Sequence, residues 1–249
     1  MAESTLAEFK QRVRLAHARE FAIHRKVAVI AEREIVSRPR SHPDAVAVVL
    51  DMLIVQGYKA HLSTEFLGEH GFVEDMATMV RRLLELAVQS IYVGADSDEP
   101  VRAQRAADFL AFLWDAVPTV QKRKLPSELQ AHWDDLAQPA TDRRPNRSRW
   151  GPRFDQMFEY AEVMETYRSD YKLLSSLAHG SSGSLIIQYS QSPIPVHSVS
   201  QVGALLIYAS RYYLVLLDHW MRLYAPDLYE RFADVSSALR DWQATDDGG

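Results

Sequence analysis

The sequence contains no cysteine among its 249 residues. Disulfides, thiolate nucleophiles and cysteine-ligated zinc or iron–sulfur sites are therefore excluded, and a reducing compartment is the natural environment for such a chain. No apolar run approaches the roughly 20 residues that a membrane-spanning helix needs. The N-terminal stretch MAESTLAEFKQRVR is charged throughout and lacks the apolar segment of a signal peptide. We therefore expect a cytoplasmic protein that makes no contact with a membrane.

The chain is also poor in glycine, with ten residues, and its net charge of −5 is small. Helix-forming residues dominate the composition, and apolar residues recur at helical spacing along most of the chain. These features predict an all-α fold built as a single helical bundle. A charge this small provides no general attraction to nucleic acid, so any such contact requires a local basic patch.

Several motifs that would identify an enzyme class are absent from the sequence. It has no glycine-rich phosphate loop, no His-Glu-x-x-His pair, no Gly-x-Ser-x-Gly elbow and no paired Glu-x-x-His motif of the di-iron bundles. We therefore expect no cofactor.

The sequence pattern divides the chain into three parts. They are an N-terminal helical extension over residues 1–40, a bundle domain over 41–243 and a frayed tail over 244–249. A sustained helical pattern from Ser4 to about Ser37 predicts one long first helix. Further helices are predicted at about 45–69, 73–93, 99–117, 126–136, 154–164, 166–180, 199–223 and 226–244. Irregular loops are expected at about 138–153 and 180–198, where proline, glycine and serine accumulate.

Two sets of histidine and acidic residues have spacings that could hold a metal. The first is His17, Glu20 and His24, and the second is His61, Glu65, Glu69 and His70. Histidine and carboxylate side chains at one helical face are zinc ligands in some proteins. We interpret both sets as charged, solvated surface and expect no metal.

The helix at 73–93 is apolar around most of its circumference, which predicts a buried central helix. A polar stripe nevertheless follows it at spacings of four, three, four and three: Thr78, Arg82, Glu85, Gln89 and Tyr92. Buried charges are costly unless they are paired. Arg82 and Glu85 lie one turn apart and can pair with each other. The stripe is therefore either a structural hydrogen-bond network or part of a site.

The segment TYRSDYKLLSSLAHG at 166–180 is expected to form one amphipathic helix. Its apolar side comprises Tyr167, Tyr171, Leu173, Leu174, Leu177 and Ala178, and its polar stripe comprises Arg168, Lys172, Ser175 and His179. Gly180 suits the left-handed position just past a helix end, and the helix dipole there favours the imidazolium form of His179. A histidine beside cations and a serine could bind an anion or protonate a leaving oxygen. Alternatively, His179 caps its own helix.

The loop QPATDRRPNRSRWGPR at 138–153 combines five arginines with one tryptophan. Arginines beside an aromatic residue can contact the phosphates and bases of nucleic acid. Arg143, Arg144 and Arg147 are therefore candidate RNA contacts, with a solvated loop as the alternative.

Two stretches resemble the signatures of DUF5677, a bacterial all-helical family of unknown function. The first is RRLLELAVQSIYV at 81–93, which is followed by a helix carrying Arg102 and Arg105. The second is YRSDYKLLSSLAHGSSGSL, beginning at Tyr167. The matching positions are Arg82 and Glu85 in the first signature, and Tyr171, Ser175 or Ser176, His179 and Gly180 in the second. The resemblance spans about 73–224 and implies a helical bundle and little about activity.

Such bundles look like the HEPN group, which includes toxin and defence ribonucleases as well as non-catalytic binding domains. The usual signature of that group is an arginine followed four to six residues later by a histidine. This chain departs from it, since ten residues separate Arg168 from His179 and seven separate Arg211 from His219.

The leading hypothesis is a HEPN-like, metal-independent ribonuclease of the toxin or phage-defence kind, directed at RNA or nucleotides. In it His179 is the acid or base, Arg82 and Arg168 bind phosphate, and Glu85 orients Arg82 or His179. The binding residues expected around them are Tyr92, Tyr171, Lys172, Ser175, Ser176, Arg143, Arg144 and Arg147. The alternative is a non-catalytic module that forms a homodimer or binds a protein partner, with the polar residues serving structure.

Overall fold

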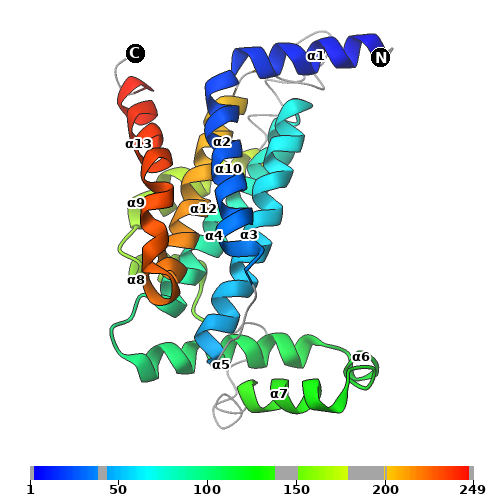
Figure 1. Cartoon of the computed structure of the whole chain (residues 1–249), viewed down its shortest axis with the longest axis vertical. Coiled ribbons are helices and arrows are strands. Elements are labelled where there is room, and N and C mark those ends of the chain that lie inside the picture. The colour runs from blue at the N-terminus through cyan, green and yellow to red at the C-terminus, as the bar shows by residue number, and fades with distance from the viewer. Residues whose placement is uncertain (1–2, 39–43, 138–150, 179–198, 200, 247–249) are drawn as a thin grey trace.

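The computed structural model describes residues 3–38, 44–137, 151–178, 199 and 201–246 of the chain. Every element in these ranges is a helix, so the predicted all-α fold is confirmed. The long helices run side by side, and a smaller group of helices crosses one end of the bundle (Figure 1). The predicted boundaries of the extension, the bundle domain and the tail stay predictions.

The N-terminal part of the chain forms two helices instead of the one long helix predicted. Helix α1 (Glu3–Ala16) and helix α2 (Ala18–Ala31) meet at His17, whose backbone angles (φ −125°, ψ 33°) are not helical. The ring of His17 lies 2.8 Å, through Nε2, from the carbonyl oxygen of Val199. Helix α1 therefore lies across the end of the bundle, while α2 and its π-helical continuation η1 (Glu32–Val36) run along it (Figure 1).

The centre of the bundle consists of α3 (Ala45–Glu69), α4 (Val73–Gly94) and α12 (Val202–Tyr224), which pack against one another, and α2 packs on α12. The prediction that α4 is the buried central helix is confirmed, because Met76, Leu83 and Leu86 are fully buried. Asp44 caps α3, since its carboxylate accepts from the Ala47 backbone N–H at 2.8 Å.

The turn between α3 and α4 depends on Gly71, which adopts a left-handed conformation with φ of 68°. Helix α3 is long and apolar enough to cross a membrane, but 56 % of its most apolar window is buried inside the bundle. A core helix passes the same test of length and composition, and α3 is packed as one.

One end of the bundle carries α5 (Glu99–Ala116), the short α6 (Thr119–Lys122) and α7 (Ser127–Ala137). Trp114 of α5 stacks on Trp133 of α7 with ring centroids 6.0 Å apart, and its indole N–H donates to Asp134 at 2.8 Å. Helix α6, a single turn, was not expected from the sequence.

The second half of the chain returns along the bundle through α8 (Phe154–Tyr160), α9 (Met164–Thr166), η3 (Tyr167–Tyr171) and α10 (Lys172–Ala178). The helix predicted at 166–180 is helical throughout its described residues, up to Ala178, but η3 is a π-helical segment that shifts the phase of the residues after it. Leu173, expected on the apolar side, is consequently 54 % exposed, while Leu174 is buried. The last two described elements are η4 (Pro226–Leu228) and α13 (Tyr229–Asp246).

Candidate functional site

A polar cluster lies between α4 and the η3–α10 segment. Its first side is on α4, where the Glu85 carboxylate lies 3.4 Å from Arg81 Nε and 3.8 Å from Arg82 Nη1. The pairing of Arg82 with Glu85 that their spacing predicts is therefore present. Arg81 makes a second pair with the same carboxylate from the i,i+4 position.

The second side of the cluster comes from η3 and α10. The Tyr171 hydroxyl donates to Glu85 Oε1 at 3.4 Å, and Arg81 Nη1 donates to the Ser175 hydroxyl at 3.2 Å. We call Arg81, Arg82, Glu85, Tyr171 and Ser175 the α4–α10 cluster. Glu85 and Ser175 are members of the two predicted polar stripes, but each contacts a residue outside the other stripe, Tyr171 and Arg81 respectively.

The local packing explains why the two sides face each other. Leu174, on the turn between Tyr171 and Ser175, is 2 % exposed and belongs to the same core as α4. The Tyr171 ring packs on Tyr167 and on Phe158, with centroid distances of 5.2 and 5.7 Å. These apolar contacts hold η3 and α10 on α4, so the hydroxyls of Tyr171 and Ser175 are directed at the charged residues.

The pKa of Glu85 differs from that of an exposed carboxylate. Burial raises the pKa of Glu85, although Arg81, Arg82 and the Tyr171 hydroxyl each lower it. The Glu85 side chain is 13 % exposed, whereas that of Arg82 is 43 % exposed. The cluster therefore holds a sheltered proton acceptor beside a cation that reaches solvent, an arrangement suited to binding a phosphate and moving a proton.

Arg82 has one further partner, which sequence reasoning did not identify. Its Nη2 donates to the side-chain oxygen of Gln56 on α3 at 2.9 Å. Arg81 was also missed as a site residue, although its spacing of four from Glu85 could have indicated it. Gln56 carries no such local signal, because its contact depends on how α3 packs against α4.

Other residues predicted for the site are not joined to the cluster. Arg168, Lys172 and Ser176 are exposed on η3 and α10, and no contact with a described residue links them to Glu85. On the α4 stripe, the Thr78 hydroxyl donates to the backbone of its own helix at 3.2 Å, and Gln89 is buried.

Tyr92, at the end of the α4 stripe, belongs to a different cluster. The Arg105 guanidinium lies over its ring at 4.4 Å and over the ring of Tyr160 at 4.3 Å. Arg105 also pairs with Asp96 at 3.2 Å and donates to the Tyr92 carbonyl oxygen at 2.7 Å. This second cluster fastens α5 and α8 to the end of α4.

Four predicted site residues, His179, Arg143, Arg144 and Arg147, lie outside the described residues. So do Gly180 and nearly all of the two predicted loops. The roles expected for these residues stay predictions.

The two residue sets considered for a metal occupy different environments. In the described parts of the chain, no three histidine or acidic side chains are grouped closely enough to hold a metal ion. Glu65 and Glu69 form ion pairs with Arg25, as expected of a charged surface. The surface interpretation is wrong for His24 and His61, which are both fully buried.

A family model with the description "Family of unknown function (DUF5677)" matches residues 48–192. This chain belongs to the DUF5677 family. The matched range contains the whole α4–α10 cluster, whereas α1, α2, α12 and α13 lie outside it. No curated protein and no solved structure matches the chain.

Proposed function

We propose that this DUF5677 protein is a HEPN-like, metal-independent ribonuclease and that the α4–α10 cluster binds and cleaves the RNA backbone. One observation carries the proposal: two arginines, a tyrosine hydroxyl and a carboxylate whose pKa is raised by burial meet where the side chain of Arg82 reaches solvent. Arginine forms paired hydrogen bonds with phosphate oxygens, so Arg81 and Arg82 are suited to hold a phosphodiester.

The proposed reaction is an internal transesterification of RNA. Glu85 accepts the proton of a ribose 2′-hydroxyl, and the 2′ oxygen forms a bond to the adjacent phosphorus. The bond from phosphorus to the 5′ oxygen of the next nucleotide breaks, and His179 donates a proton to that leaving oxygen. The products are a 2′,3′-cyclic phosphate and a 5′-hydroxyl. Arg81 and Arg82 stabilise the charge that develops on the phosphate oxygens.

In this scheme Glu85 is a base, a role different from the orienting role that its sequence position suggests. The raised pKa favours the new role, because a carboxylate that holds a proton more tightly is a better general base near neutral pH. Arg168 is exposed on η3 and is not joined to the cluster, so its role as a further phosphate contact stays a prediction.

The test is cleavage of an end-labelled single-stranded RNA in the presence of a metal chelator. Wild type, His179→Ala and the control His132→Ala are compared, since His132 is exposed on α7. The proposal predicts chelator-resistant cleavage that is lost in His179→Ala alone, with unchanged thermal stability. Absence of cleavage by wild type, or equal cleavage by His179→Ala, would overturn it.

A specific observation favours the second candidate function, a non-catalytic interaction module. Leu62 and Phe66 are 41 % and 62 % exposed, and together with Met79 they line a groove of about 530 Å³ between α3 and α4. Exposed clusters of large apolar side chains are typical of protein interfaces. Light scattering of wild type and Phe66→Ser tests this function. An interaction module that self-associates predicts a wild-type dimer that dissociates in Phe66→Ser. A wild-type monomer counts against self-association.

A further inference from the structure

A second groove of about 310 Å³ lies between α12 and α13, on helices outside the matched family region. Its floor is aliphatic and includes Ile207, Leu214 and Leu239. Its volume is near the lower end of the range of small-ligand sites, which is about 300–1,000 Å³. The groove can therefore hold a small molecule, but it is small for a partner helix.

Two arginines contribute to the groove, one from each helix. Arg211 comes from α12 and Arg240 from α13, and both are exposed. Neither makes an ion pair or a hydrogen bond with any residue in the part of the chain that the structure describes. The carboxylate of Asp218 is already engaged, since it pairs with Arg222 at 2.9 Å and accepts from the Tyr229 hydroxyl at 2.9 Å. The positive charge of the groove is therefore not neutralised by its acidic residue.

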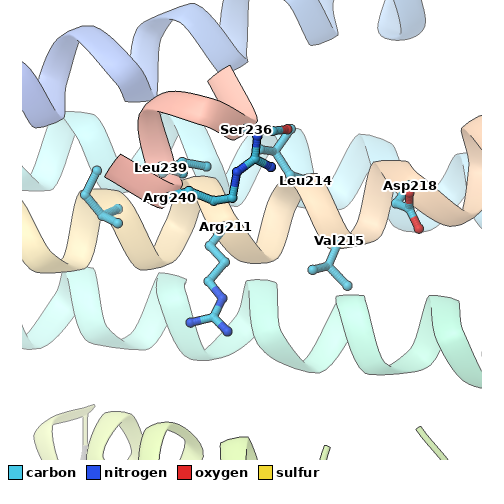
Figure 2. Close-up of a pocket in the computed structure, with 8 residues that line it drawn as sticks. Arg211, Leu214, Val215, Asp218, Ser236, Leu239 and Arg240 are labelled. Carbon is cyan, nitrogen blue, oxygen red and sulfur yellow. The ribbon is translucent and has the colours of Figure 1, made fainter. Parts of the chain in front are cut away.

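Figure 2 shows how the two arginines differ in position. Arg240 reaches from α13 over α12, and its guanidinium lies beside Ser236 and Leu214. Arg211 leaves α12 on its other edge and points away from α13. Arg240 and the Ser236 hydroxyl can thus bind one anion directly, whereas Arg211 contributes charge at the rim.

We propose that this groove binds a free acyl carboxylate of medium chain length. Its carboxylate would accept hydrogen bonds from Arg240 and Ser236, and its chain would lie on Ile207, Leu214 and Leu239. The lining residues include no aromatic ring. An aliphatic chain therefore suits the floor better than a nucleobase, which stacks on aromatic side chains. This site is separate from the α4–α10 cluster and does not depend on its function.

The test is isothermal titration of the full chain with decanoate. Acetate has the charge without the chain, and decanamide has the chain without the charge, so both are expected to bind at least tenfold more weakly. Arg240→Gln removes a charge-assisted hydrogen bond, which corresponds to a loss of at least tenfold in affinity. Arg211→Gln should weaken binding about threefold at low salt and not at high salt, because an exposed charge is screened. Arg231→Gln, exposed on α13, is the matched control and should bind as wild type does.

Three results would overturn the proposal. The first is that decanoate does not bind, and the second is that it binds equally to wild type and Arg240→Gln. The third is that the protein binds phosphatidylglycerol vesicles through Arg240 but not free decanoate, which would assign the groove to a membrane surface. Folding of each variant is checked by its circular dichroism spectrum and thermal midpoint.

Discussion

The imidazole rings of His24 and His61 lie parallel in the core, with their centroids 3.5 Å apart and their planes inclined by 3°. His24, from α2, donates through Nε2 to the carbonyl oxygen of His61 at 3.0 Å, and its Nδ1 lies 3.1 Å from the hydroxyl of Ser210. The two ring nitrogens of His61 have no hydrogen-bond partner among the described residues. Burial lowers the pKa of His24 to about 4, and it lowers the pKa of His61 well below 6.5.

This arrangement predicts that the protein loses stability under mildly acidic conditions. Because the pKa of each histidine is lower in the folded state, the unfolded chain binds more protons below pH 6.5. The contribution of the two neutral histidines to the free energy of unfolding is fully present above that pH, and it decreases as the pH falls toward 4. For His24 the loss between pH 7 and pH 5 is about 2 kcal/mol. Urea unfolding at pH 7, 6 and 5 measures it.

The variant that tests this prediction is His61→Leu, which removes one buried histidine without adding a polar atom. We expect a shallower dependence of the unfolding free energy on pH, whereas His132→Gln on the surface should leave the dependence unchanged. A wild-type free energy that is constant between pH 7 and pH 5 would contradict the neutral, buried pair.

Arg105 is predicted to stabilise the fold strongly. Its side chain is 16 % exposed and contacts two tyrosine rings, one carboxylate and one carbonyl oxygen. Arg105→Ala should lower the unfolding free energy by about 2–4 kcal/mol, because all these interactions are lost together. Arg222→Ala removes an ion pair of a side chain that is 67 % exposed and should cost about 0.5 kcal/mol or less. If chemical denaturation gave equal losses of unfolding free energy for the two substitutions, Arg105 would not have this strong stabilising role.

Gly57 lies on α3 where this helix packs tightly against α12. A Cβ atom at this position would lie 2.5 Å from Leu216 Cδ2 and 3.1 Å from the Tyr213 ring. Gly57→Ala should therefore destabilise the protein by about 1–3 kcal/mol, since overpacking forces the helices apart. Gly94→Ala is the matched control, because its nearest contact would be an ordinary 3.5 Å. Gly94→Ala should leave the thermal stability unchanged or raise it slightly. A greater loss of stability in Gly94→Ala than in Gly57→Ala would contradict this packing.

The helices whose apolar periodicity is strong could be predicted from the sequence alone. The predicted ranges of α3, α4 and α12 agree closely with the observed ones, because their apolar faces are continuous over many turns. The break at His17 could not be predicted, since it is accompanied by a contact with Val199, 182 residues away. The π-helical segment η3 likewise leaves no mark in the apolar pattern.

The candidate site was predictable only in part, for a similar reason. The spacing of Arg82 and Glu85 on one helix predicts their contact, and the apolar residues at 166–180 predict a helix there. The contacts of Arg81 with Ser175 and of Arg82 with Gln56 join different helices, so they depend on packing. The burial of His24 and His61 was missed because histidine and charged neighbours at helical spacing normally indicate surface.

The measurement that tests the proposed ribonuclease most directly is the rate of RNA cleavage by Glu85→Gln, compared with wild type and the exposed control Glu159→Gln. Glutamine keeps the shape of the side chain and can still accept from Tyr171, but it cannot take a proton from the 2′-hydroxyl. The proposal predicts that Glu85→Gln lowers the rate by about 10²–10⁴-fold while its thermal midpoint stays close to that of wild type. Cleavage by Glu85→Gln at the wild-type rate would contradict the account.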